Sequence, residues 1–229
     1  MIHVFANNEV PILGSWTAEQ TIGEKTYRHL LLFSGNYFSH SVFESKDGSF
    51  VMTRGGSFSS SGNESYGVIV EFNSADPSTV GAGTYVNVSV KEGKLYLSGV
   101  DGIPTEWMSD EKNSSTALTG PWLFSGRKND NGEIERRGTD GPRKTMKIIT
   151  GSKFHWIAYN TDTREFFGSG GGTYEAVDGK YTEKIEFFSR DNSRVGASLS
   201  FDFKVEDADW HHSGLSSQGK PIYEVWSKR

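Results

Sequence analysis

The sequence predicts an all-β protein built from two tandem antiparallel β-barrels of seven to eight strands each. Three observations support this prediction. The chain contains an internal duplication, and its apolar residues alternate with polar ones over short segments, as in strands with one buried face. No stretch shows the longer period of an amphipathic helix. We assign the two barrels to residues 1–112 and residues 113–229.

The duplication is clearest in one gapless alignment. Residues 66–82 (YGVIVEFNSADPSTVGA) align with residues 181–197 (YTEKIEFFSRDNSRVGA), and 9 of the 17 positions are identical. The glycine pair Gly55-Gly56 falls on Gly171-Gly172, and each half opens with a Gly-x-Trp motif, at residues 14–16 and 120–122. The chain is therefore predicted to hold two copies of one unit.

Strands are predicted in order along each unit. Residues 198–206 alternate almost without fault, with Leu199, Phe201 and Phe203 on one face and polar residues on the other. The other strands expected in the second unit cover residues 145–150, 154–159, 165–176, 180–189, 209–213 and 222–228. The polar segment 109–117 between the units is short, so we expect the two barrels to touch.

Composition limits the possible functions. The 229 residues include 34% hydrophobic and 13% aromatic residues, which is enough for a packed core. The absence of cysteine excludes disulfides, cysteine nucleophiles and thiolate metal sites. The net charge of −5 argues against a nucleic-acid partner. No apolar run approaches the length of about 18 residues that a membrane span requires, so no membrane span is expected.

The start of the sequence bears on location. Residues 2–6 have neither a basic flank nor an apolar stretch long enough for a signal peptide. We expect a periplasmic or extracellular protein whose leader is absent from this numbering, and the sequence leaves a cytoplasmic location open.

A family resemblance rests on the two ends of the second unit. Gly120-Pro121-Trp122 opens it, and Lys228 and Arg229 follow Trp226 in its last segment. This arrangement resembles the lipocalin and calycin barrels, and implies that Trp122 packs near the closed end beneath a basic side chain. The segments KIITGSKFHWIAYN, GSGGGTY, YTEKIEFFS and IYEVW are similar to lipocalin-like domains of uncharacterised bacterial secreted proteins. That resemblance implies a fold and no activity.

Comparison of the two copies predicts where the chemistry lies. Glu183 stands where the first copy has Val68, Lys147 where it has Leu31, and His212 where it has Leu97. Tyr181, Glu183, Ile185 and Phe187 are expected to share one face, and a carboxylate on an apolar face must be paired, protonated or functional. The candidate cavity of the second barrel is lined by Lys147, Trp156, Tyr174, Glu183, His212 and Glu224. A buried Lys–Glu pair with a purely structural role is the alternative, as is an inverted assignment of the faces.

Other motifs point away from common chemistries. The glycines of segment 168–172 precede a strand and not a helix, so they indicate a bend or bulge rather than a phosphate-binding loop. His211 and His212 are adjacent and face opposite ways, so they cannot both bind one metal ion, and no metal site is expected. No cofactor is expected either. Glu183 and Glu224 are the pair of carboxylates that could converge for glycoside hydrolysis.

These observations favour a protein that binds a small hydrophobic or amphipathic ligand in the second barrel, because an eight-stranded barrel can hold one small ligand or be filled by side chains. The resemblance to calycins leaves an enzyme open, either an isomerase or cyclase or a hydrolase, with Glu183 as acid or base beside Lys147 or His212. A third possibility is that both barrels are filled and the surface recognises a protein or a glycan. Ligand identity and oligomeric state stay open.

Overall fold

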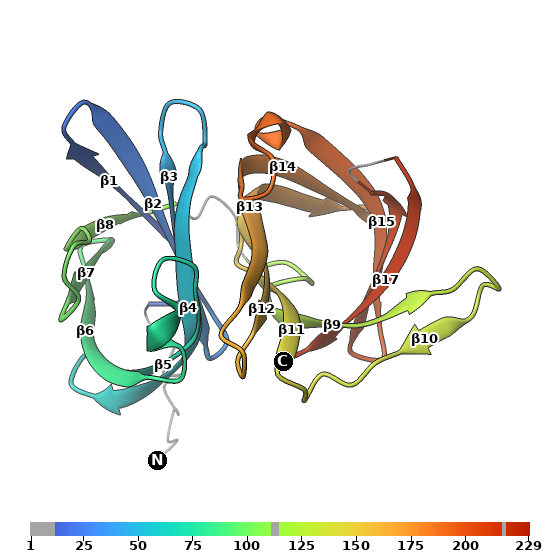
Figure 1. The fold of residues 1–229 in the computed structure, drawn as a ribbon, viewed down its shortest axis with the longest axis horizontal. Coiled ribbons are helices and arrows are strands. Elements are labelled where there is room, and N and C mark those ends of the chain that lie inside the picture. Colours follow the sequence, from blue (N-terminus) through green and yellow to red (C-terminus); the bar gives the residue numbers. More distant parts are fainter. Residues whose placement is uncertain (1–11, 111–114, 217–218) are drawn as a thin grey trace, which may run out of the picture.

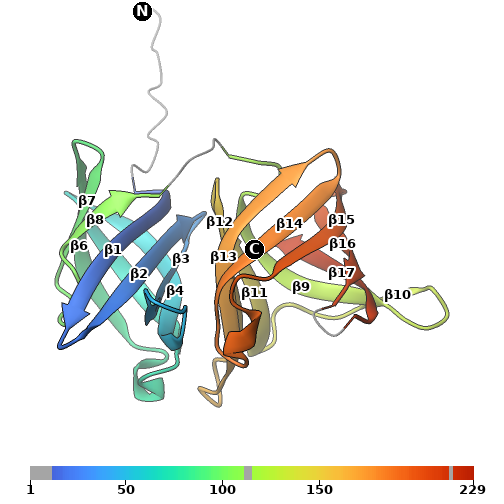
Figure 2. The ribbon, with the colours of Figure 1, turned by 90° about the horizontal axis from the view of Figure 1, so that it is seen from above.

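The structure is a computed structural model that describes residues 12–110, 115–216 and 219–229. Two closed antiparallel barrels, each of eight strands, lie side by side, as Figures 1 and 2 show. The predicted all-β class and tandem barrels are confirmed. The expectations for residues 2–6 and for the boundary between residues 112 and 113 lie outside the described residues.

The first barrel is a simple meander in which each strand pairs with the next and β8 pairs back onto β1. Its strands are β1 (Gly14–Ile22), β2 (Lys25–Ser34), β3 (Tyr37–Glu44), β4 (Phe50–Gly62), β5 (Ser65–Asn73), β6 (Gly83–Lys91), β7 (Lys94–Ser98) and β8 (Glu106–Ser109). A short 3-10 helix, η1 (Pro77–Thr79), connects β5 to β6.

The second barrel repeats this order and closes through pairing of its first and last strands. Its strands are β9 (Gly120–Lys128), β11 (Arg143–Ile149), β12 (Lys153–Asn160), β13 (Phe166–Val177), β14 (Lys180–Phe188), β15 (Ser198–Glu206), β16 (Asp209–Leu215) and β17 (Pro221–Lys228). The helix η2 (Asn192–Arg194) corresponds to η1. Strand β10 (Ile134–Arg136) extends a hairpin from β9 that projects from the barrel (Figure 1). No helix among the described residues is long and apolar enough to cross a membrane.

The glycine pairs of β4 and β13 lie at β-bulges, at equivalent places in the two barrels. The strand register shifts between Gly55 and Gly56 and again between Gly171 and Gly172. A Cβ at Gly172 would collide with the carbonyl oxygen of Lys184, because the neighbouring strand approaches closely there. The prediction of a bulge in place of a phosphate loop is therefore confirmed.

This bulge corrects one predicted face. Tyr181 and Ile185 point into the second barrel, but Phe187 does not follow them. The extra residue at the bulge turns the strand, so Phe187 packs outside the barrel and stacks on Phe43 at a ring distance of 4.9 Å. Simple alternation fails here because it assumes an unbroken pleat.

A shared apolar core joins the barrels. Strands β2, β3 and β5 of the first barrel and β9, β11, β12 and β14 of the second contribute fully buried side chains to it. At its edge, Arg229 makes two charged hydrogen bonds to Glu71, of 2.8 and 2.9 Å, and Tyr159 donates a third of 2.6 Å. The expectation that the units touch is confirmed, and the contact resembles a core more than a loose tether.

The tryptophans that open the barrels are held alike. The indole nitrogen of Trp16 donates to the carbonyl of Ile12 at 2.9 Å, and that of Trp122 donates to Leu118 at 2.7 Å. Lys228 Nζ lies 4.3 Å from the centre of the Trp122 ring, which is the basic partner that the family resemblance implied. Among the described residues, no cation lies over Trp16.

Candidate ligand-binding site

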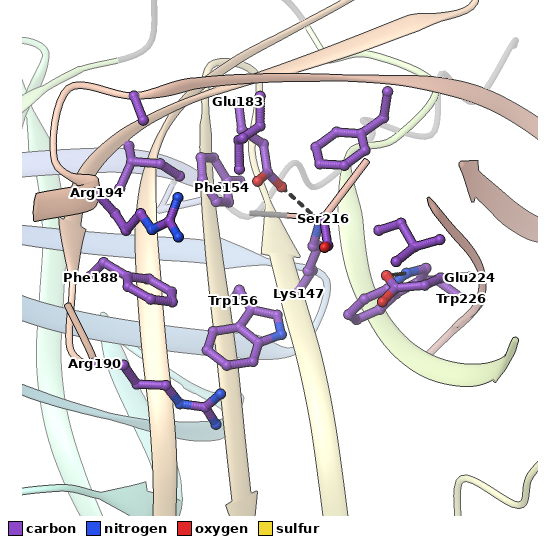
Figure 3. A pocket seen from close by; sticks show the side chains of 16 residues that line it. Lys147, Phe154, Trp156, Glu183, Phe188, Arg190, Arg194, Ser216, Glu224 and Trp226 are labelled. Carbon is purple, nitrogen blue, oxygen red and sulfur yellow. Dashed lines mark hydrogen bonds and ion pairs between the residues drawn. The ribbon is translucent and has the colours of Figure 1, made fainter. Parts of the chain in front are cut away.

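The second barrel contains a partly open cavity of about 280 Å³ (Figure 3). Most of the side chains around it are apolar or aromatic, and a few polar groups converge among them. The lining residues are Lys147, Phe154, Trp156, Gly170, Glu183, Ile185, Phe188, Arg190, Arg194, Ala197, Leu199, Phe201, Ser216, Ile222, Glu224 and Trp226. An apolar chamber with a small number of placed polar groups is the usual form of a small-molecule site.

A buried ion pair forms part of the lining of this cavity. Lys147 Nζ of β11 lies 2.7 Å from Glu183 Oε1 of β14, and their side chains are only 6% and 9% exposed. The hydroxyl of Tyr181 donates to the same oxygen at 2.8 Å. Burial and the nearby charge of Glu183 raise the pKa of Tyr181 well above its ordinary value, so this hydroxyl stays protonated as a donor. The predicted inward face of Lys147 and Glu183 is correct.

Aromatic rings surround the lysine. Its ammonium nitrogen lies 5.0 Å from the ring centre of Tyr181, 4.9 Å from that of Trp210 and 5.2 Å from that of Trp226. Each distance is short enough for a cation–π interaction. The rings hold the ammonium group in place and replace part of its lost hydration.

A second acidic group sits on β17. Glu224 Oε2 accepts hydrogen bonds from Trp226 Nε1 at 3.1 Å and from His212 Nδ1 at 3.3 Å. Burial, together with the charge of Lys147, lowers the pKa of His212 below its ordinary value. Burial acts to raise the pKa of Glu224, but its bonds to His212 and the charge of Lys147 outweigh this and lower the pKa. The carboxylate is therefore ionised beside a neutral imidazole at neutral pH.

Each of the two carboxylates has one oxygen without a partner among the described residues. Within the described part of the chain, Glu183 and Glu224 each use a single oxygen for protein partners, and no donor reaches Oε2 of Glu183 or Oε1 of Glu224. A carboxylate oxygen that faces a cavity accepts hydrogen bonds from hydroxyl or amino groups. The interior can thus recognise hydrogen-bond donors.

Two arginines stand at the turn that follows β14. Arg190 donates two hydrogen bonds to the carbonyl of Phe167, and its guanidinium carbon lies 5.2 Å from the ring centre of Trp156. Arg194 pairs with Asp191 at 3.5 Å. Both arginines line the cavity, so its rim carries positive charge.

The structure brings together four of the six residues predicted for the site. Lys147, Trp156, Glu183 and Glu224 line one cavity. His212 is buried behind Glu224 and does not line it.

Tyr174 is also not part of the lining. It packs with the buried core of the second barrel, and its hydroxyl donates to the carbonyl of Thr150 at 2.6 Å. The alternation of residues along the strand predicted correctly that Tyr174 faces inward. It carries no information on which part of the interior is filled by core side chains.

Sequence reasoning missed the rim arginines. Their signal was present in the alignment of the two copies, where Arg190 stands opposite Ala75 and Arg194 opposite Thr79. The same comparison that singled out Glu183 would have found them. It was applied only to strand faces, whereas these residues lie on the connection that carries η2.

The site does not fit a metal centre. No group of three or more histidine, aspartate or glutamate side chains lies close enough to hold a metal ion within the described ranges. The lysine beside Glu183 also competes with a cation for that carboxylate.

Two closed eight-stranded meanders, with a lysine over the opening tryptophan of the second, define a tandem lipocalin-like fold. Comparison with protein-family models found no match. Comparison with curated protein sequences found none either.

Proposed function

We propose that this protein binds a small amphipathic ligand in the second barrel. The observation that carries the proposal is the 280 Å³ cavity, whose apolar and aromatic walls surround two carboxylates with free oxygens. Its volume lies close to the lower end of ligand pockets, about 300 to 1,000 Å³. The ligand is accordingly compact, with an apolar body and at least one hydroxyl or amino group.

The polar groups define the orientation of the ligand. Donors on the ligand face Glu183 and Glu224 inside, and an electronegative group lies toward Arg190 and Arg194 at the rim. Flat rings stack against Trp156 or Phe188, whose own rings stack at 6.2 Å. The ligand class we favour is therefore an aromatic or alicyclic compound that carries polar groups at both ends.

Dye displacement tests this proposal. We expect an environment-sensitive naphthalene-sulfonate dye to bind, and we expect small hydroxylated aromatic compounds to displace it. The variant Leu199→Trp fills the cavity from β15 and should abolish the signal. Val205→Trp is the matched control, because residue 205 lies on the same strand, is 42% exposed and does not line the cavity.

Two outcomes would overturn the proposal. One is equal dye binding by the wild-type protein and Leu199→Trp, since this would place the dye elsewhere. The other is failure of a broad panel of lipids, sterols and aromatic acids to bind, measured by native mass spectrometry as well as by displacement.

The competing function of surface recognition has less support. Among the described residues, Tyr85 and Tyr96 are the exposed aromatic side chains, at 70% and 36%, and they form no extended row. The acid–base alternative stays tied to Glu183, which already shares one oxygen between Lys147 and Tyr181. Turnover of a bound compound, followed by mass spectrometry, would favour that alternative over simple binding.

We propose a periplasmic or extracellular location for this binding, because segments of the second barrel resemble lipocalin-like domains of bacterial secreted proteins. Fractionation of the native host, with detection by antibody, checks this location.

A further inference from the structure

The first barrel has a cavity system of its own. An inner cavity of about 150 Å³ is lined mainly by aliphatic and aromatic side chains, among them Leu31, Val86 and Trp107. A wider outer cavity of about 400 Å³ lies next to it. His40, Arg54 and Ile103 line both, so these residues stand where the two cavities meet.

Arg54 is the charged side chain of the inner lining. It is half-buried on β4, and within the described part of the chain its guanidinium group forms neither a hydrogen bond nor an ion pair. Asp101 lines the outer cavity but makes no ion pair with it. Burial lowers the pKa of Arg54, although an arginine stays charged at neutral pH. A partly desolvated cation without a counter-ion is unfavourable unless something supplies the opposite charge.

A pair of histidines lies beside this arginine. Arg54 is directly opposite His40 in the strand register, and His40 Nε2 lies 3.0 Å from His29 Nδ1. Both rings are at least nine-tenths buried, and the outer nitrogens, His29 Nε2 and His40 Nδ1, have no partner. Whichever tautomer forms, one ring N–H of this pair lacks an acceptor, and an orphaned buried donor costs about 1 to 3 kcal/mol.

The fold does not require these groups. The second barrel has Gly170 at the position equivalent to Arg54 and Trp156 at that of His40, and it closes into the same eight-stranded meander. Arg54 also lies opposite Asn73, so its neighbours on β5 give it no acid. The arginine is thus specific to the first barrel and has no role in closing it.

We propose that the first barrel holds a second, separate ligand site, in which Arg54 binds the carboxylate of a small amphiphile and the apolar inner cavity binds its tail. Guanidinium groups pair with carboxylates through two parallel hydrogen bonds, which suits an arginine at the mouth of an apolar chamber. The carboxylate also brings an acceptor next to the histidine pair. This site takes an acid, whereas the interior of the second barrel offers carboxylates and favours donors.

Hexanoate and hexan-1-ol are matched probes, because they share a tail and differ in charge. Titration calorimetry and NMR of hexanoate labelled with ¹³C at the carboxyl group should show that wild-type protein binds the acid. Arg54→Gln should weaken hexanoate binding about tenfold or more and leave hexan-1-ol binding unchanged. Arg28→Gln is the control, since residue 28 neighbours His29 on β2 but lines neither cavity.

Further variants separate the two barrels. Val100→Trp, which fills the inner cavity of the first barrel, should weaken binding of both probes. Leu199→Trp in the second barrel should leave hexanoate binding intact. If Arg54→Gln fails to fold, Val100→Trp with the two probes still decides the result.

Three results would overturn the proposal. They are hexanoate binding by Arg54→Gln at wild-type strength, hexanoate binding that is lost in Leu199→Trp but kept in Val100→Trp, and no hexanoate binding by the wild-type protein. A failure of dye binding in the second barrel leaves these outcomes unchanged, so the two sites are tested independently.

Discussion

Replacement of the buried ion pair by the residues of the first barrel tests what the pair is for. Lys147 and Glu183 occupy the positions that Leu31 and Val68 hold in the first copy. At 2.7 Å and an effective dielectric constant of about 20, their attraction is about 6 kcal/mol. Removal of the two charges from water costs several kcal/mol per ion, so the net contribution of the pair is close to zero.

The variants should therefore behave non-additively. Lys147→Leu or Glu183→Val alone leaves one buried charge unpaired and should lower the free energy of unfolding by about 3 to 5 kcal/mol. The double variant should return to within about 1 kcal/mol of the wild type, or exceed it, because two aliphatic side chains of suitable size fill these positions in the first barrel. Urea unfolding, followed by circular dichroism, measures all four proteins of the cycle.

Ligand binding gives the second half of this test. If the pair serves binding, the double variant should be stable and yet fail to bind the ligand of the second barrel. Additive losses, with the double variant less stable than either single variant, would refute the energetic argument. Full binding by a stable double variant would show that Glu183 has no role in recognition.

Three other predictions follow from the described geometry. Burial, aided by Arg54, lowers the pKa of His29 to about 4, and burial lowers that of His155 to about 3. Because these histidines have the higher pKa in the unfolded chain, their full contribution to the free energy of unfolding is present above about pH 6.5. The free energy of unfolding should fall by about 2 kcal/mol per histidine at pH 5. Equal urea midpoints at pH 7 and pH 5 would contradict this prediction. Gly172→Ala should cost about 3 kcal/mol and Gly138→Ala, in open space, almost nothing, as thermal unfolding would reveal. Phe187→Ala should cost about 3 to 5 kcal/mol through loss of packing between the barrels, and an unchanged melting temperature would speak against a shared core.

Much of this architecture follows from local pattern. Alternation predicted residues 198–206 as a strand, and β15 has the same bounds. The glycine pairs predicted bends where the register shifts. These features depend on neighbours in sequence or on backbone sterics, which a single sequence carries.

Spatial partners were harder to predict. A bulge turned Phe187 out of the barrel, and no residue count along the strand could place it in the contact between barrels. The three aromatic rings around the ammonium group of Lys147 belong to Tyr181, Trp210 and Trp226, which lie on three different strands. Such contacts depend on barrel radius and strand tilt, which the sequence pattern leaves open.

The shared residues of the duplicated segment have structural tasks. Asp76 and Asp191 accept from the backbone of Ser78 and Ser193 at the start of η1 and η2. The hydroxyl of Ser74 accepts from the backbone of Thr53 on β4 at 2.9 Å, and that of Ser189 accepts from Ser169 on β13 at 2.8 Å. These four accepting residues, which both copies keep, therefore shape the connections that carry η1 and η2.

Several of the residues that differ line the cavities. Val68 faces the inner cavity of the first barrel and Glu183 that of the second, and Arg190 and Arg194 replace an alanine and a threonine at the rim. Outside the aligned segment, Arg54 and Gly170 follow the same rule. The two barrels share one backbone arrangement and differ in the side chains inside it, and under our proposals these differing side chains select the ligands. This difference is why we propose an acid for the first barrel, where Arg54 lines the inner cavity, and a ligand with hydrogen-bond donors for the second, where two carboxylates line the cavity.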